Sequence, residues 1–236
     1  MRLCCLSDTH TKHKGLTIPE CDVLIHAGDS TWTGEYRETR RFIEWFAAQP
    51  AKHKVLIAGN HELTLDENHS KFNPHVRNLV LNQRGFIYLE NSEVVIDGIK
   101  FWGTPWTPWF HDWAFNGYPD ADAPFERGVS LLDIYKEMPE DVNVIISHGP
   151  PYGMGDQTLD GDDRVGSVDM RKLTSNLDHL RLYISGHIHE ARGMEIADGG
   201  VHYCNVSTLD RDYDTVRVPV VIDVDENGFV ENVEGY

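Results

Sequence analysis

Five apolar runs rich in β-branched residues recur along the chain and predict strands. They lie at residues 3–7, 22–29, 54–62, 142–151 and 180–189. Their apolar positions are continuous rather than alternating, which is typical of strands buried on both faces of a parallel sheet. We therefore expect these runs to form the centre of the fold.

Segments with helical periodicity separate several of these strands. The segment 35–49 places apolar side chains at helical spacing, among them Phe42 and Phe46, and Pro50 ends it. The same character is found in residues 125–137 and 168–179. This alternation of strands and helices predicts an α/β fold with a largely parallel sheet.

Two further zones contain strand-like segments separated by turn residues. They comprise residues 86–103 and the C-terminal stretches 194–207 and 218–234. Their Gly, Asp and Asn turns predict hairpins, and so a second sheet or antiparallel edges. The segment 104–124 is rich in aromatic residues and proline without periodicity, and we expect an ordered loop there.

Composition fits one soluble globular domain spanning residues 1–236. Hydrophobic residues make up 40% of the chain and charged residues 25%, as in ordinary globular proteins. No apolar stretch approaches the roughly 18 residues of a membrane span, and the first residues lack a secretory signal pattern. We therefore expect a cytoplasmic protein without membrane association, whose four cysteines stay reduced and mostly buried.

The formal net charge of −17 bears on the partners. Proteins that grip duplex DNA present basic surfaces, because phosphate neutralisation supplies most of their affinity. Stable binding to duplex nucleic acid is therefore not expected. The sequence leaves the oligomeric state open, with a homodimer as one option.

Polar residues of metal-ligand type follow each of the five predicted strands. They are Asp8 and His10, Asp29, Asn60 with His61 and Glu62, His148, and finally His187 and His189. In open α/β sheets, sites form at the carboxyl ends of the strands, which parallel strands bring to one edge. We therefore expect these side chains to converge although they are far apart in sequence.

The spacing within the blocks suits shared metal ions. Residues two apart on a strand point to the same side, so Asp8 and His10 can serve one ion together. His187 and His189 can each address one of two neighbouring ions. A set of Asp, His and Asn without Cys suits Mn, Fe or Zn rather than a structural thiolate zinc site.

The remaining histidines have simpler interpretations. His26 lies within a strand run, so we expect it to support the site or the core rather than bind metal. Five others lie in polar segments, and we expect them to be solvated: His13, His53, His69, His75 and His179.

The sequence resembles the calcineurin-like metallophosphoesterases. The resemblance is carried by five blocks in the family's order, namely Asp8-x-His10, Gly28-Asp29, Gly59-Asn60-His61-Glu62, His148 and Gly186-His187-x-His189. The strings "GTPWTPWF", "WAFN" and "SHGPP" are further similar to the metallophosphoesterase-domain (MPPED) subgroup of small phosphodiesterases, which act on cyclic nucleotides. The fold that this resemblance implies is a four-layer α/β/β/α sandwich with two central mixed sheets.

The resemblance also implies roles for individual residues. One metal ion would be held by Asp8, His10, Asp29 and His189, and a second by Asp29, Asn60, His148 and His187. Asp29 would bridge the two ions, and His61 would protonate the leaving group without binding metal. Some relatives have Gly in place of His187, and because this chain retains the histidine both metal sites should fill.

The function expected from these features is a dinuclear metal phosphodiesterase, with Mn preferred and Fe or Zn as alternatives. A metal-activated hydroxide would attack the phosphorus of a small phosphodiester or cyclic nucleotide in line with the leaving oxygen. A phosphomonoesterase or nuclease on the same metals is an alternative, and a non-catalytic interaction scaffold is another. Aromatic side chains of the 104–124 loop could stack a nucleobase or could pack against the core.

Overall fold

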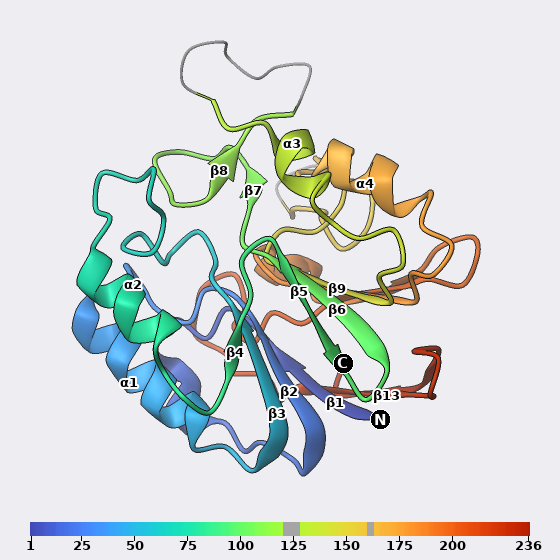
Figure 1. Ribbon diagram of the computed structural model, residues 1–236, viewed down its shortest axis with the longest axis horizontal. Helices are drawn as coiled ribbons and strands as arrows, with labels where there is room; N and C mark the ends of the chain where they lie inside the picture. Colours follow the sequence, from blue (N-terminus) through green and yellow to red (C-terminus); the bar gives the residue numbers. More distant parts are fainter. Residues whose placement is uncertain (120–127, 160–162) are drawn as a thin grey trace.

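Two mixed sheets of six strands form the centre of the computed structural model, which describes residues 1–119, 128–159 and 163–236 (Figure 1). In the first sheet the strand order is β14-β13-β1-β2-β3-β4, and β1 to β4 run parallel. The bounds are β1 Arg2–Leu6, β2 Cys21–Ala27, β3 Ala51–Ile57, β4 Ile87–Tyr88, β13 Val220–Val224 and β14 Val230–Glu234. The antiparallel strands β13 and β14 close one side of this sheet.

The second sheet has the order β11-β12-β10-β9-β6-β5. Its inner strands β12, β10, β9 and β6 are parallel, and the edge strands β11 and β5 are antiparallel to their neighbours. The bounds are β5 Ser92–Ile96, β6 Ile99–Thr104, β9 Val144–Ser147, β10 Leu182–Ser185, β11 Gly193–Ile196 and β12 His202–Asn205. The predicted second sheet and antiparallel edges are therefore confirmed.

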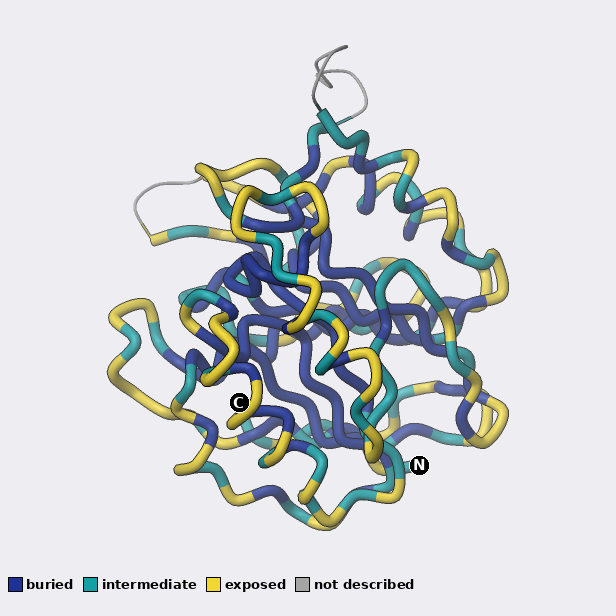
Figure 2. The backbone as a smooth tube through the Cα atoms, turned by 60° about the vertical axis from the view of Figure 1, so that its left-hand side comes forward, coloured by how far each residue is buried: buried dark blue, intermediate teal, exposed yellow. Residues whose placement is uncertain are grey.

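The continuous apolar runs are explained by burial on both faces of each sheet. In β1, Leu3 and Cys5 belong to a core shared with strands of the second sheet, such as Ile146 in β9. The alternate residue Cys4 belongs to a second cluster, together with Phe42 of helix α1. Adjacent residues of a strand point to opposite faces, so every position in such a strand is apolar. Figure 2 shows these strands as the buried centre of the molecule.

Helices cover the outer faces of both sheets. Helix α1 (Tyr36–Ala47) and helix α2 (Pro74–Leu81) lie against the first sheet, and α3 (Leu131–Tyr135) and α4 (Val168–Thr174) lie against the second (Figure 1). This is the expected four-layer α/β/β/α arrangement. No helix was predicted at α2, although Asn73 caps it through the backbone N–H of His75 and Pro74 follows at its first position.

Two of the predicted helices are shorter than expected. Helix α3 begins after Ser130, whose hydroxyl accepts a hydrogen bond from the backbone N–H of Asp133, so the part of the prediction at 128–130 is wrong. Residues 125–127 of that prediction lie outside the described residues. Helix α4 ends at Thr174 rather than at residue 179.

The remaining elements are short. They are the strand pair β7 (Thr107–Pro108) and β8 (Asn116–Gly117) and the 3₁₀ turns η1 (Lys12–Gly15) and η3 (His189–Ala191). All four cysteines are buried and free of disulfides. Over the described residues, none of the helices has the length and apolar character needed to cross a membrane.

Candidate metal centre

The structure brings all seven expected metal-ligand residues and His61 together at the carboxyl ends of the central strands. Strands β1, β2 and β3 of the first sheet are followed by Asp8 and His10, Asp29, and Asn60 with His61. Strands β9 and β10 of the second sheet are followed by His148 and by His187 and His189. We call these eight residues the polar floor. All are buried except His187, which is half-buried.

Asp29 lies at the middle of the polar floor. Its Oδ1 is 3.3 Å from Nε2 of His148, and its Oδ2 is 3.7 Å from Nε2 of His10. Groups of ligand atoms that lie within 4.8 Å of one another include Asp29, His148 and His187 on one side and Asp8, His10 and His189 on the other. The two oxygens of one carboxylate therefore face two different histidine groups.

His10, His148 and His189 are each held through one ring nitrogen. Nδ1 of His10, of His148 and of His189 lies 2.9–3.1 Å from the backbone carbonyls of Thr31, Ala27 and Asp210 respectively. A carbonyl accepts only from a protonated nitrogen, so each contact fixes a proton on Nδ1 and leaves Nε2 as the nitrogen that faces the carboxylates of the floor. Metal-binding histidines are oriented in this way in proteins.

Nε2 of His10 provides a direct test of whether the residues fit a metal ion. This atom is buried and has no hydrogen-bond partner among the described residues. Buried polar atoms are almost always paired, so an unpaired one indicates a missing partner. With two carboxylates, an amide oxygen and imidazoles around it, the donor set matches what Mn, Fe or Zn accept.

The backbone of the floor adopts strained conformations. Asp8, His10, Asp29 and His187 all have positive φ angles, between 35° and 68°. Such conformations cost about 1–3 kcal/mol each and concentrate at functional sites. They are held here by cross-strand hydrogen bonds, from Asp8 N to the Gly28 carbonyl at 2.9 Å and from His10 N to the Asp29 carbonyl at 3.1 Å.

Two glycines allow the floor residues to approach one another. A Cβ atom at Gly59 would collide with Oδ1 of Asp29, and one at Gly186 would collide with the carboxylate of Asp8. At these two positions the backbone therefore lies too close to a floor carboxylate for any residue larger than glycine.

The charges of the floor favour cations. Burial alone raises the pKa of Asp29, but the charges of His148 and His61 hold that pKa well below its ordinary value. For His148, burial lowers the pKa, but the carboxylate of Asp29 raises it to about 9. Burial lowers the pKa of His10 to about 4, so this ring is neutral and able to donate a lone pair. Two buried carboxylates therefore remain ionised, beside the neutral ring of His10 and the positively charged ring of His148.

Glu62 supports the loops of the polar floor. The sequence shows only its place in the block Gly59-Asn60-His61-Glu62 and not this role. Its buried carboxylate accepts hydrogen bonds from the backbone N–H groups of Asp29, Thr31 and Gly59 at 3.0, 3.0 and 2.7 Å. It also accepts from the hydroxyls of Thr31 and Ser30 at 2.8 and 3.1 Å. One side chain thus ties the loop after β2 to the loop after β3.

Asn205 plays a similar part in the second sheet and was not foreseen. Its Nδ2 donates to the backbone carbonyls of Gly186 and Ile188 at 3.2 and 2.9 Å. These carbonyls flank His187, whose own backbone N–H donates to both carboxylate oxygens of Asp8 at 3.1 Å. The loop that carries the last two floor histidines is therefore fixed from both sides. The position of Asn205 at the end of β12 is the signal that could have indicated it.

The structure confirms several of the predictions for the other histidines and contradicts one. His26 is buried in β2 with Nε2 3.1 Å from the Thr9 hydroxyl, outside all three candidate metal groups. His75 and His179 are exposed, as expected. The prediction for His13 is wrong, because the 3₁₀ turn η1 places this residue under α1, where it is only 2% exposed.

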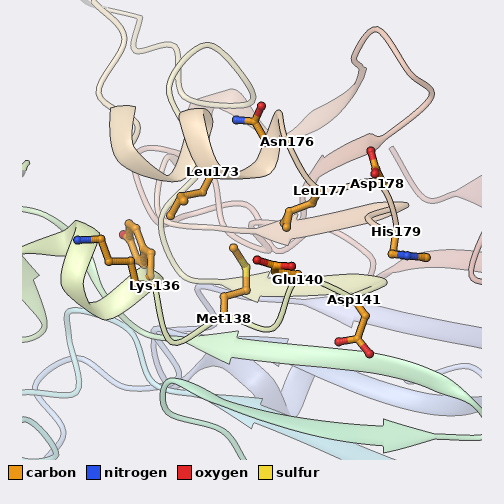
Figure 3. Close-up of a pocket in the computed structure, with 10 residues that line it drawn as sticks. Lys136, Met138, Glu140, Asp141, Leu173, Asn176, Leu177, Asp178 and His179 are labelled. Carbon is orange, nitrogen blue, oxygen red and sulfur yellow. The ribbon is translucent and has the colours of Figure 1, made fainter.

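The polar floor opens into a cavity of about 370 Å³. A larger cavity of about 600 Å³ lies by helices α3 and α4, and Figure 3 shows Leu173 and Met138 facing each other across it. None of the three candidate metal groups found in the described residues includes a residue that lines this larger cavity. Its Asp141 is already paired with Lys100 at 2.7 Å. The cavity of about 370 Å³ over the polar floor is therefore the candidate active site.

Solved structures of other proteins share this fold. A dimetal phosphatase from Danio rerio aligns over 94% of this chain and 92% of its own, with a TM-score of 0.52 and 10% identity. The protein TT1561 of Thermus thermophilus aligns over 99% of this chain and 98% of its own, with a TM-score of 0.56 and 13% identity. These alignments show that the chain shares its fold with both proteins.

Sequence comparison identifies the family to which the chain belongs. The model of the calcineurin-like phosphoesterase family matches residues 1–191. Human metallophosphoesterase domain-containing protein 1 is 38% identical over 94% of this chain and 71% of its own length. The UPF0046 protein K07C11.7 of Caenorhabditis elegans is 32% identical, covering 94% of this chain and 74% of its own. The chain belongs to the calcineurin-like phosphoesterase family, and its likeness to the MPPED subgroup is confirmed.

Proposed function

We propose that this protein is a dinuclear metal-dependent phosphodiesterase that hydrolyses small phosphodiesters, with cyclic nucleotides as the preferred class. The observation that carries the proposal is the position of Asp29, whose two carboxylate oxygens face two separate groups of histidines. A carboxylate in this position suits two neighbouring metal ions that share one ligand. Family membership supports the hydrolysis of phosphoesters.

The residues divide into two ligand sets in this proposal. Asp8, His10, Asp29 and His189 hold one ion, and Asp29, Asn60, His148 and His187 hold the other. When bound, such ions supply Lewis acidity and an activated water as nucleophile. Mn is our first choice for the metal, with Fe and Zn as alternatives, because oxygen and imidazole donors suit all three.

His61 supplies the proton for the leaving oxygen. Its Nδ1 lies 2.8 Å from the Trp32 carbonyl and therefore carries a hydrogen. Its Nε2 lies 3.9 Å from Oδ2 of Asp29, at the wall of the same cavity. The ring of Trp113 stacks on the imidazole at a centroid distance of 4.1 Å and fixes its plane. A histidine held in this way is suited to general acid catalysis near neutral pH.

A diester fits the charge of the cavity better than a monoester does. Among the described residues that line the cavity there is no Lys or Arg. A monoester carries up to two negative charges on its phosphate near neutral pH, whereas a diester carries one. Because the described lining residues supply no positive charge, a diester needs less counter-charge from this cavity than a monoester does.

The test is the hydrolysis of bis-p-nitrophenyl phosphate by metal-stripped protein before and after Mn²⁺ is added, with Asp29→Ala measured alongside. Activity that returns with Mn²⁺ in the wild type and stays absent in the variant supports a bridged dinuclear phosphodiesterase. Fe²⁺ and Zn²⁺ are compared in the same assay. Faster hydrolysis of p-nitrophenyl phosphate would favour the monoesterase, and no activity with any metal in folded protein would favour the scaffold.

A further inference from the structure

The aromatic side chains of the loop around β7 and β8 have different surroundings. Trp106 and Phe115 are 6% and 1% exposed and pack into the core. Trp113 is half-buried and stacks on His61. Trp109 and Phe110, in contrast, are 53% and 57% exposed at the cavity over the polar floor. We call Trp109, Phe110 and Trp113 the aromatic wall.

The exposed rings are carried by a loop that is firmly attached. The backbone N–H of Trp109 donates to the Gly117 carbonyl at 2.8 Å. The side chain of Asn116 donates to the His111 carbonyl at 2.8 Å and accepts from the backbone N–H of Phe110 at 3.3 Å. Large apolar side chains that stay exposed on such a fixed support indicate a binding surface.

The loop is also tied to the polar floor itself. The backbone N–H of Ala114 donates to the carbonyl of Asn60 at 3.1 Å. The backbone N–H of the next residue, Phe115, donates to the buried carboxylate of Asp66 at 2.7 Å. The aromatic wall therefore keeps a fixed position relative to a proposed metal ligand, as a group that positions a substrate must.

The surroundings of the wall indicate the chemistry of the group that binds there. Val165, Ile188 and Tyr213 line the same cavity, and none of its described lining residues is Lys or Arg. A second phosphate would find no counter-charge among these described lining residues. A neutral planar ring would instead find aromatic faces and apolar side chains, with which it can stack.

We infer that Trp109 and Phe110 form a subsite for the nucleobase of the substrate, while the phosphodiester lies over the polar floor. This inference rests on the proposed function and extends it to the group that is recognised. The subsite selects diesters that carry a neutral heteroaromatic ring over diesters that carry none. It does not select among phosphate geometries, because the wall lies beside the floor rather than within it.

The experiment compares two substrates with the same five-membered cyclic phosphodiester, adenosine 2′,3′-cyclic phosphate and glycerol 1,2-cyclic phosphate. Only the first carries a base. Hydrolysis by the Mn²⁺-loaded protein is followed by ³¹P NMR, and the ratio of the two kcat/KM values measures base recognition. We expect the wild type to prefer the nucleotide, and Trp109→Ala and Phe110→Ala each to lower this ratio about 5- to 150-fold, the range for a lost base–aromatic stack. Phe110→Tyr should restore most of the preference because it retains an aromatic face.

Phe229→Ala is the matched control. Phe229 is 48% exposed, and it packs 4.3 Å from the guanidinium of Arg181. Arg181 directly precedes β10, so this aromatic ring lies at the opposite edge of the sheet from the polar floor. The control should leave the substrate ratio at its wild-type value. A ratio that falls equally in Phe229→Ala and Trp109→Ala would overturn the subsite.

Further outcomes separate the subsite from the proposed function. If both substrates are hydrolysed and neither wall variant changes the ratio, the subsite is wrong and the phosphodiesterase stands. If the wild type hydrolyses neither substrate, the cyclic diesterase function fails. The subsite is then decided by calorimetric titration of adenosine 5′-monophosphate and glycerol phosphate into Mn²⁺-loaded protein. Equal affinity of wild type and Trp109→Ala for the nucleotide would overturn the subsite.

Discussion

The polar floor and the aromatic wall line the same cavity but are built in opposite ways. The floor is assembled from five strand ends of two sheets. Its side chains are buried except for the half-buried His187, and hydrogen bonds hold the rings of His10, His148 and His189. The wall comes from a single loop between β7 and β8, and two of its three rings are about half exposed. Rigid sheet edges supply the fixed geometry that chemistry requires, and the loop supplies the surface that recognises the substrate.

The comparison predicts two classes of mutational effect. A substitution in the floor should affect every phosphodiester, because each one must lie over the same residues. A substitution in the wall should affect only substrates that carry a ring. His61 connects the two regions, since it belongs to the floor and stacks on Trp113 of the wall.

The largest effect of the following predictions is expected for His61→Ala. Loss of a general acid costs about 10²–10⁴-fold when the leaving group is a poorly acidic alkoxide. Adenosine 2′,3′-cyclic phosphate should show this loss in kcat, whereas bis-p-nitrophenyl phosphate should lose far less because p-nitrophenolate leaves without a proton. Equal losses on both substrates would show that His61 binds metal or substrate instead of protonating the leaving group.

Glu62→Gln should weaken metal binding next most. The carboxylate accepts hydrogen bonds from five donors, and the amide that replaces it would direct an NH₂ group at some of them. Loss of such an outer partner lowers metal affinity about 10- to 100-fold. Mn²⁺ titration calorimetry measures this loss, and the thermal midpoint of the metal-free protein should also fall.

Glu44→Gln provides the control for that measurement. Glu44 is an exposed residue of α1 that pairs with Arg40 at 2.8 Å. Its substitution removes the same charge without touching the floor, so Mn²⁺ affinity should stay at the wild-type value. Mn²⁺ affinities that decline equally in both variants would attribute the effect to net charge rather than to the loops after β2 and β3.

The floor could be predicted from the sequence because its signal is local and repeated. Each predicted strand ended in a residue such as Asp8 or His148, and the topology of parallel strands brought those ends to one edge. Burial on both faces was likewise visible in the continuous apolar runs, and the turn residues of two further zones predicted a second sheet or antiparallel edges. The ligand roles themselves remain a prediction, which the Mn²⁺ experiments address.

The wall could not be predicted in the same way, because tertiary contacts decide which aromatic rings of the 104–124 loop are buried and which are exposed. All of its rings lie in one aperiodic stretch, and nothing in that stretch distinguishes Trp106, which is buried, from Trp109, which is exposed. The role of Glu62 was hidden for a similar reason, since four of its five donors lie about 30 residues away in sequence. Helix α2 was missed although its cap and its buried Val76 and Val80 were visible in the sequence.

A smaller effect on substrate preference is expected from Asn116, which helps to fix the loop between β7 and β8. Asn116→Ala removes the side chain that holds the carbonyl of His111 and the N–H of Phe110. Each lost hydrogen bond costs about 0.5–1 kcal/mol, so the preference for adenosine 2′,3′-cyclic phosphate over glycerol 1,2-cyclic phosphate should fall about 2- to 5-fold. Asn82→Ala, at the end of α2, is the matched control. A fall as large as that of Trp109→Ala would mean that the loop, rather than its rings, determines recognition.

The smallest effect on activity is expected for His13→Phe, which contrasts a histidine outside the cavity with those of the floor. Neither ring nitrogen of His13 has a hydrogen-bond partner among the described residues, and the ring packs 5.4 Å from Phe42 and 5.0 Å from Trp45. Burial lowers its pKa to about 4, from an ordinary value of 6.5. The unfolded chain therefore binds more protons between these two values, and the free energy of unfolding falls as the pH decreases through that range.

Phenylalanine at position 13 removes the group that binds the proton but keeps an aromatic ring packed against Phe42 and Trp45. One pKa unit corresponds to about 1.4 kcal/mol, so between about pH 7 and about pH 5 the wild type should lose roughly 2 kcal/mol more than His13→Phe does. Urea unfolding of both metal-free proteins at the two pH values measures this difference, and contributions from the shared floor residues cancel. Equal acid sensitivity would show that His13 is hydrated in solution. A clear difference would establish that His13 stays neutral in the core of this fold, in contrast to the ionised carboxylates of the floor.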